Sequence, residues 1–587
     1  MQNTPDRPVE NLAIATIIEV DGTHIVAELD VNLLELSRIY RGDLYPIGQF
    51  GSILKIHFGR RVLYAYVSRL RMKSDFDRER GIQEATRGDA RVIEADLFGE
   101  AEWEQSSEDD KSVWRMRFER GVSTFPLPQQ RLYLTPRLEL YELYGQQADC
   151  AFELGEHVGV SGAKCFADIN ALACKHTAIL GSTGAGKSAA VAAVIHGIVD
   201  LKANEQLWSP RIVILDPHDE YSSAFSDNRK LSTDDGTLLL PYWLLSFEET
   251  LSLIIGKSEY AATSQTNILR NALINARIEG ALELGIDTEG ITADSPIPYR
   301  LGDPTGLDIF GEREGVKEEI GLVGKINAQR PEGSRSQSNH SEYAKIINKL
   351  ASLVKDSRLA FMMRSWDGLE DPIASIAGQF LAGDEPVRIV DLSSLPNEVA
   401  GAASAATARL LFSIKLWQTS EERASTPVVL VCEEAHRYVP NRGDAQYAAA
   451  QDAIRRIAKE GRKYGIGLVL VSQRPSDVEP TVLSQCNSWI VLRITNEADR
   501  SHVKSVLPDS LSGLTSVLSG LRRREAIVVG LATVLPSRVL IRQLTDEQLP
   551  QSHDIDFVEG WQKSAATTES LEKVGMRWRY QNRRLGI

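Results

Sequence analysis

The pattern of apolar and polar positions changes character near residue 150. Before this point, short runs rich in β-branched and aromatic residues are separated by Gly, Asp and Pro, at residues 23–31, 51–58, 62–70, 90–98, 112–119 and 130–136. Short strands at such intervals predict a small β-barrel or sandwich. The acidic stretch from Asp96 to Asp110 is expected to be a solvated loop between two strands.

From residue 150 onward, apolar runs alternate with helical segments. The runs are short and almost continuously apolar, at residues 176–180, 211–216, 387–392, 427–433, 466–472, 488–494 and 525–530. Strands buried on both faces have this composition, and their alternation with helices predicts a parallel α/β sheet.

Some 170 residues separate the second run from the third, far more than an ordinary crossover connection needs. This interval contains helical patterns at 247–256, 265–285 and 342–356, and a polar, glycine-rich stretch at about 285–340. We therefore expect an inserted helical subdomain with a mobile loop. The expected division is a barrel at 1–145, a core in two parts at 146–245 and 386–545, the insertion at 246–385 and a C-terminal tail at 546–587.

Composition excludes some classes of protein. A chain of 587 residues is too long for one compact core. It has no apolar run of about 18 to 20 residues and no signal-peptide pattern at its start, so a cytoplasmic protein without a membrane segment is expected. Five cysteines form no CxxC pair, which predicts no metal or disulfide role. A net charge of −14 argues against a surface that coats nucleic acid indiscriminately, but permits a local basic channel.

The clearest motif is a phosphate-binding loop. A buried strand precedes it and the helical pattern 189–200 follows it; its members are Gly181, Ser182, Thr183, Gly184, Ala185, Gly186, Lys187 and Ser188. Glycines let backbone N–H groups surround phosphate oxygens, while Lys187 reaches the β and γ phosphates and the Ser188 hydroxyl ligates Mg²⁺. ATP and Mg²⁺ are therefore the expected cofactors.

Two later strands end in residues suited to phosphoryl transfer. Glu433 ends the run 427–433 and Glu434 follows it. We expect Glu433 to support Mg²⁺ through a coordinated water and Glu434 to polarise the attacking water. Gln473 ends the run 466–472, where ligands bind in open α/β sheets, and is expected to sense the γ phosphate.

Other candidates have alternative interpretations. Asp216 and Glu220 either face the nucleotide or belong to a simple Asp-Pro turn. Arg462, at the end of the basic helical pattern 449–467, is the candidate for an arginine finger acting in a neighbouring subunit. Residues 522–524, three arginines before a strand, are either a DNA-contacting loop or a turn with hydrated charges.

Four separated motifs together resemble the HerA ATPases of the HerA-FtsK superfamily. They are the segments 152–188, 214–221, 432–440 and 461–500, following a barrel-like region that ends in "FPLP". The resemblance implies a RecA-like P-loop NTPase core, an N-terminal HAS-barrel, an inserted helical bundle and a homohexameric ring that encircles or pumps duplex DNA. Glu433 is a departure, since many relatives have aspartate at this position.

The resemblance also implies a partner. Family members work with a nuclease in DNA end processing, or with a nuclease or sirtuin-like NADase effector in defence against phage, and the barrel is the expected docking face. Two further hypotheses remain: a ring scaffold that uses ATP to assemble and control an effector, and a small-molecule kinase, which the long insertion fits poorly. The basic final residues 577–587 either brace a neighbouring subunit, contact nucleic acid or form a disordered terminus.

Overall fold

The computed structural model of the protein divides into two compact units, Met1–Trp208 with Val469–Asp546, and Ser209–Leu468 with Glu547–Ile587. The structure describes residues 7–31, 33, 36–49, 51–81, 90–108, 111–145, 150–158, 162–201, 208–255, 263–302, 310–313, 316–330, 337–395, 397–441, 448–507, 517–551, 557–563 and 566–580.

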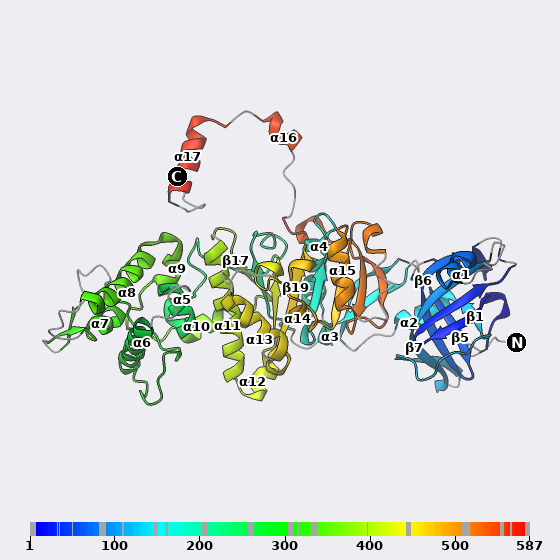
Figure 1. Ribbon diagram of the computed structural model, residues 1–587, viewed down its shortest axis with the longest axis horizontal. Helices are drawn as coiled ribbons and strands as arrows, with labels where there is room; N and C mark the ends of the chain where they lie inside the picture. The colour runs from blue at the N-terminus through cyan, green and yellow to red at the C-terminus, as the bar shows by residue number, and fades with distance from the viewer. Residues whose placement is uncertain are drawn as a thin grey trace. The chain divides into compact units, whose positions relative to one another are not determined.

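The first unit begins with a closed β-barrel, drawn in blue in Figure 1. Its sheet has the order β2-β1-β9-β5-β6-β7-β8, and an additional pairing between β2 and β7 closes it. The strands are β1 (Ala13–Asp21), β2 (His24–Leu29), β5 (Ile53–Phe58), β6 (Arg61–Met72), β7 (Arg91–Glu108), β8 (Lys111–Arg120) and β9 (Arg131–Leu134). Fully buried aliphatic side chains such as Ile14, Leu54 and Ile93 fill the barrel. The predicted barrel is confirmed.

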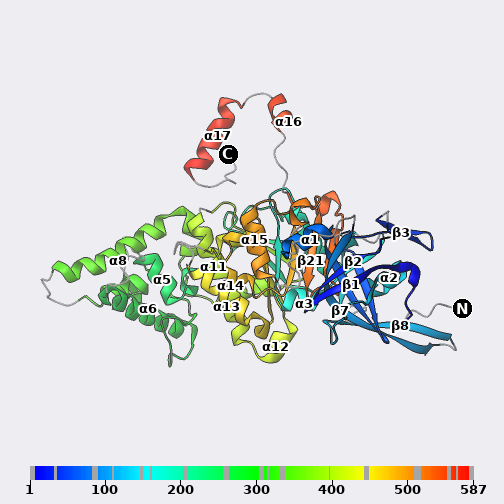
Figure 2. The same ribbon diagram turned by 45° about the vertical axis from the view of Figure 1, so that its right-hand side comes forward.

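The acidic stretch from Asp96 to Asp110 was expected to be a loop, and this expectation is wrong for its described residues. Up to Glu108 it belongs to β7, which continues with β8 as a long antiparallel ribbon (Figure 2). Leu97 and Ala101 on this strand are both 2% exposed. Acids such as Glu100 and Glu102 alternate with these buried residues and are half-buried, so the segment has a polar composition although it is a strand. Residues 109 and 110 lie outside the described part.

The rest of the first unit holds one part of the α/β sheet. Its strand order is β11-β10-β22-β21-β20-β12-β19. The strands are β10 (Ala151–His157), β11 (Lys164–Asp168), β12 (Thr177–Leu180), β19 (Ile466–Ser472), β20 (Ser488–Leu492), β21 (Glu525–Gly530) and β22 (Ser537–Ile541). β12 is parallel to β19 and β20, as predicted. The run 525–530 does form a strand, but β21 is antiparallel to β20.

Helices accompany these strands in the first unit. They are α1 (Lys73–Glu79), α2 (Arg137–Gly145), α3 (Ile169–Cys174), α4 (Lys187–Val199), α14 (Pro480–Leu483) and α15 (Glu497–Val506). α2 connects the barrel to β10, and a buried ion pair fixes it to the barrel: Lys55 Nζ lies 2.6 Å from Glu139 Oε2.

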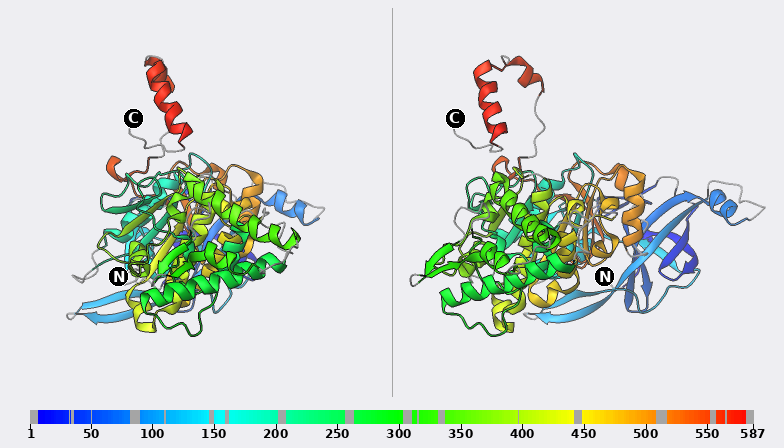
Figure 3. Two further views of the ribbon diagram at one scale, coloured as in Figure 1. Left: turned by 90° about the vertical axis from the view of Figure 1, so that its left-hand side faces the viewer. Right: turned by 60° about the vertical axis from the view of Figure 1, so that its left-hand side comes forward.

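The second unit contains four parallel strands in the order β18-β13-β17-β14. They are β13 (Ile212–Asp216), β14 (Asn228–Ser232), β17 (Val387–Asp391) and β18 (Val428–Cys432). Between β14 and β17 the chain is mainly helical, drawn in green in Figure 3. This helical region contains α5 (Phe247–Ile254), α6 (Thr263–Leu284), α7 (Gly321–Asn327), α8 (Gln337–Lys355), α9 (Ala360–Met363) and α10 (Ile373–Leu381).

The polar stretch at about 285–340 was expected to be a loop. Its described residues include the β15 (Phe310–Arg313) and β16 (Val316–Glu319) hairpin and α7, and its other residues at 303–309, 314–315 and 331–336 lie outside the described part. The remaining helices of this unit are α11 (Asn397–Trp417), α12 (Ser420–Ser425), α13 (Ala448–Tyr464), α16 (Phe557–Gln562) and α17 (Thr568–Arg579). The basic terminus is thus helical as far as Arg579.

One helix among the described residues is long and apolar enough to cross a membrane by composition alone. It is Val399–Trp417, within α11, with a mean hydropathy of 1.3. Because 67% of this segment is buried inside the protein, it has the surroundings of a core helix.

Candidate nucleotide site

The phosphate loop occupies residues 181–188, between the end of β12 and the first turn of α4. Gly184 and Gly186 have φ angles of 74° and 94°, a left-handed conformation that glycine adopts without the steric cost of a Cβ atom. The loop curls tightly there, and the backbone N–H of Ala185 donates to the carbonyl of Ser182 at 3.1 Å. This is the backbone shape that a phosphate cradle needs.

Lys187 and Ser188 are the first residues of α4. Lys187 is 8% exposed, and Ser188 is half-buried. The N-terminus of a helix presents N–H groups that lack intrahelical acceptors and the positive end of the helix dipole. Together with the curled glycine backbone, this arrangement fits a polyphosphate, and a hydroxyl at Ser188 is the ligand type that a nucleotide-bound Mg²⁺ uses.

Gln473 lies beside the phosphate loop in the same unit. β12 and β19 are parallel, with Leu180 paired to Ser472, so the residues that follow these strands emerge at the same edge of the sheet. The Thr183 hydroxyl donates a hydrogen bond of 2.7 Å to Gln473 Oε1. The structure therefore brings Gln473 into contact with the loop expected to hold the nucleotide.

In the second unit, Glu433 and Glu434 follow β18 and have different surroundings. They are 2% and 5% exposed. The backbone N–H of Glu433 donates to the carbonyl of Leu215 at 3.3 Å, which continues the sheet pairing. Glu434 has φ and ψ of 53° and 50°, a left-handed conformation uncommon for residues other than glycine. The chain turns at Glu434, whose Oε2 lies 3.2 Å from Nδ1 of His436.

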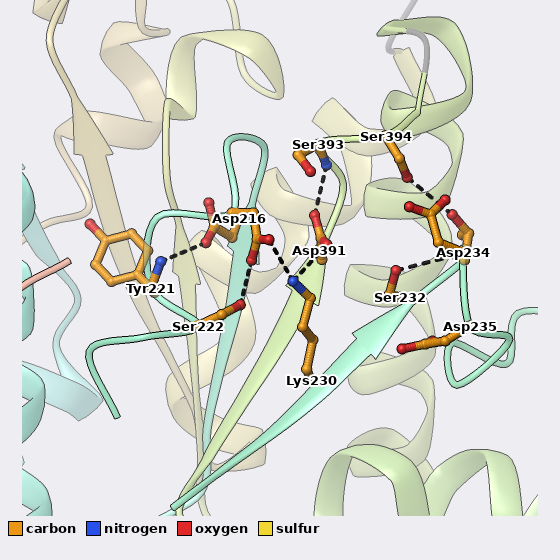
Figure 4. Close-up of polar contacts among 12 residues, drawn as sticks. Asp216, Tyr221, Ser222, Lys230, Ser232, Asp234, Asp235, Asp391, Ser393 and Ser394 are labelled. Atoms are coloured by element: carbon orange, nitrogen blue, oxygen red, sulfur yellow. Dashed lines mark hydrogen bonds and ion pairs between the residues drawn. The ribbon is translucent and has the colours of Figure 1, made fainter. Parts of the chain in front are cut away.

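The turn after β13 is built around the carboxylate of Asp216 (Figure 4). This side chain is fully buried, and its two oxygens accept the backbone N–H groups of His218 at 3.1 Å and Tyr221 at 3.0 Å. Burial raises the pKa of Asp216 to about 6, an effect that the nearby Glu433 increases and the backbone donors oppose. Asp216 thus organises its own turn, and the Tyr221 hydroxyl donates to Glu433 Oε2 at 3.0 Å.

Comparison with known proteins relates the central part of this chain to one family. The model of the family described as "Helicase HerA, central domain" matches residues 152–411. Two relatives named DNA double-strand break repair helicase HerA, from Pyrococcus furiosus and Saccharolobus solfataricus, are 28% and 27% identical to this chain. The aligned segments cover 64% and 74% of this chain, and 66% and 76% of those proteins. Residues 152–411 therefore match the HerA central-domain family, and the chain as a whole is similar to HerA helicases. It is an ATPase.

The solved structure of VirB4 from Thermoanaerobacter pseudethanolicus is also similar, with a TM-score of 0.44 and 17% identity, over 68% of this chain and 99% of that chain.

Polar residues that were not predicted from the sequence lie at the carboxyl ends of β14 and β17. Asp391 ends β17 and is paired in register with Asp216 and with Ser232. Lys230 Nζ lies 2.9 Å from Asp391 Oδ2 (Figure 4). Lys230 also forms an ion pair with Asp219. The run "VRIVD" that ends at Asp391 has the same form as the run "IVILD" that ends at Asp216. This similarity could have indicated Asp391 from the sequence.

Glu220 and Arg462 lie in the second unit. The Glu220 carbonyl accepts the backbone N–H of Gln551 at 2.8 Å. Arg462 is exposed in the last turn of α13. Arg455 on the same helix lies 3.1 Å from Asp452, in the kind of pairing that the sequence predicts.

The arginine turn at residues 522–524 adjoins the phosphate loop. The backbone N–H of Arg524 donates to the Ala185 carbonyl at 3.1 Å, and Arg524 has a φ of 68°. Arg522 is exposed, and its backbone N–H donates to Glu525 Oε2 at 3.0 Å. The turn is thus part of the packing around the nucleotide loop.

No group of three or more His, Cys, Asp or Glu side chains with metal-ligand geometry occurs among the residues that the structure describes. A Mg²⁺ ion held mainly by nucleotide phosphates, a serine hydroxyl and waters needs no such group. The donor set therefore suits a metal that arrives with its nucleotide.

Proposed function

We propose that this protein is an ATP-driven DNA translocase or helicase. The observation that carries the proposal is the phosphate loop at the start of α4, with its left-handed glycines, its buried Lys187 and the hydrogen bond from Thr183 to Gln473. Relatives named as DNA repair helicases support the choice of DNA as the substrate on which the ATPase acts.

Each proposed catalytic residue has a defined task. The backbone of the loop and Lys187 bind the phosphates, and Ser188 and Glu433 are the residues that would hold Mg²⁺. When bound, Mg²⁺ offsets phosphate charge as the γ phosphoryl group is transferred to water. Glu434 accepts a proton from the attacking water, and Gln473 orients that water or donates to the γ phosphate.

Assembly into a homohexameric ring is part of the proposal. Arg462, exposed on α13, would enter the nucleotide site of a neighbouring copy and stabilise the charge that develops in the transition state. Duplex DNA would pass through the bore, where a few basic side chains per subunit are multiplied sixfold, so that a chain with a net charge of −14 still binds it.

The barrel at residues 1–145 is the proposed docking domain for a partner enzyme. The partner would be a nuclease or a sirtuin-like effector, and the assembly would act in DNA processing or in defence against phage. In this scheme the core at 146–245 and 386–545 is the motor, the region 246–385 is its helical insertion, and the tail at 546–587 braces the ring.

The proposal is tested by measuring ATP hydrolysis with and without duplex DNA across a salt series. We expect stimulation by DNA, and a DNA-binding constant whose logarithm falls linearly with the logarithm of salt concentration, because phosphate contacts release counterions. Hydrolysis that is indifferent to DNA, with no salt-dependent binding, would overturn the proposed action on DNA.

A further inference from the structure

Tyr221 connects two loops that are far apart in the sequence. It ends the turn after β13, whereas Glu433 follows β18, 212 positions later. The Tyr221 side chain is fully buried, and its hydroxyl donates to Glu433 Oε2 at 3.0 Å. A buried tyrosine hydroxyl cannot exchange its hydrogen-bond partner for water. This contact therefore fixes the position of the Glu433 carboxylate.

The backbone of the same turn is held in place by Asp216. The carboxylate of Asp216 accepts the backbone N–H of Tyr221 at 3.0 Å and that of His218 at 3.1 Å. Asp216 itself ends β13, whose Leu215 is paired in register with Cys432 of β18. The Tyr221 ring is thus attached to the sheet at the point where Glu433 leaves it.

A second contact joins the same two loops. Arg437 Nη2 lies 3.1 Å from His218 Nε2. The turn after β13 therefore contacts the loop after β18 at one residue before Glu434 in the sequence and at one residue after it. A single hydrogen bond would allow one loop to rotate about it. Two contacts restrict the rotation of the two loops relative to each other as well as the distance between them.

A carboxylate that is 2% exposed is costly unless hydrogen bonds satisfy and orient it. Partners of this kind set the direction in which the remaining oxygen of a metal-supporting carboxylate points, and their loss typically lowers metal affinity or activity about 10- to 100-fold. We propose that Tyr221 is a positioning residue for Glu433, holding its carboxylate in the orientation in which it supports Mg²⁺. This inference rests on the role proposed above for Glu433.

The test is Tyr221→Phe, which removes only the hydroxyl. The matched control is Tyr242→Phe in the same unit, where a buried tyrosine hydroxyl donates to the Tyr299 carbonyl. A fluorescent ATP analogue is bound at equilibrium with Mg²⁺ and with EDTA, and the thermal unfolding midpoint of each variant is recorded.

We expect Tyr221→Phe to reduce the Mg²⁺-dependent gain in nucleotide affinity about tenfold while leaving metal-free affinity unchanged; Tyr242→Phe should leave both at the wild-type values. A wild-type Mg²⁺ response in Tyr221→Phe, or an equal loss in both variants, would overturn the proposal. ATP hydrolysis by the wild-type protein is measured separately. Its absence would contradict the proposed ATPase function, whatever the result for Tyr221→Phe.

A double-mutant cycle excludes a general packing effect. In a Glu433→Gln background, Tyr221→Phe should cause less than a twofold further loss in the Mg²⁺ response, because both changes remove one interaction. Full additivity of the two losses would show that Tyr221 does not act through Glu433.

Discussion

The Thr183 hydroxyl donates a hydrogen bond of 2.7 Å to Oε1 of Gln473. Thr183 belongs to the phosphate loop and Gln473 to the end of the neighbouring parallel strand, so the residue expected to sense the nucleotide already contacts the loop that binds it. A γ phosphate that attracts the glutamine would compete with this bond, which gives the nucleotide a direct means of moving Gln473.

The first prediction concerns Gln473. Replacing it with alanine should reduce kcat about 10- to 100-fold while the affinity for ATP changes less than threefold, because the glutamine acts on the attacking water rather than on binding. Steady-state hydrolysis and equilibrium nucleotide binding measure the two effects. Thr183→Val, which removes only the partner hydroxyl, should cost less than Gln473→Ala; a larger loss in Thr183→Val would reverse the assigned roles.

Lys187 supplies the second prediction. Lys187→Ala should weaken ATP binding at least tenfold, since it removes the charge expected to contact the β and γ phosphates. Isothermal titration with a non-hydrolysable analogue measures the loss. Lys459→Ala, an exposed lysine on α13, is the control for a change in overall charge. Equal affinities in the two variants would remove Lys187 from the site.

The third prediction concerns the charge of Glu434. Glu434→Gln is expected to retain ATP binding and to lose hydrolysis about 100-fold or more, because general-base catalysis contributes about 10² to 10⁴. Single-turnover hydrolysis at saturating ATP measures the effect. Hydrolysis at the wild-type rate in this variant would exclude Glu434 as the base.

The length of Glu433 is the basis of the fourth prediction. Aspartate is one methylene shorter, so Glu433→Asp should lose the hydrogen bond from Tyr221, now 3.0 Å long. We expect the Mg²⁺ concentration that gives half-maximal hydrolysis to rise about tenfold. If Glu433→Asp matches the wild type in a Mg²⁺ titration, the longer side chain has no functional role here.

Features set by local sequence were predicted well. Six of the barrel strands, the phosphate-loop strand and α4 each have a continuous periodic or motif signal, and the structure contains them. The barrel strand β1 was not predicted. β7 was partly mistaken for a loop because acids such as Glu100 and Glu102 alternate with buried residues such as Ala101. β14 was missed because Asn228, Arg229 and Lys230 are polar, although Lys230 pairs with Asp391 once the strand is in place.

Contacts between distant segments could not be predicted from one sequence. The bond from Tyr221 to Glu433 depends on β13 and β18 being neighbours, and strand order leaves no local trace in either segment. The contact between Arg524 and Ala185 was also unpredictable, because residues 522–524 have the composition of any charged turn.

Displacement of the third strand of a DNA triplex tests the central claim most directly, because it requires movement along the duplex and not only ATP hydrolysis. The account predicts ATP-dependent displacement by the wild-type protein and none by Lys187→Ala or Glu434→Gln. Wild-type protein that hydrolyses ATP and binds duplex DNA, yet leaves the third strand in place, would contradict translocation and favour an ATP-regulated scaffold.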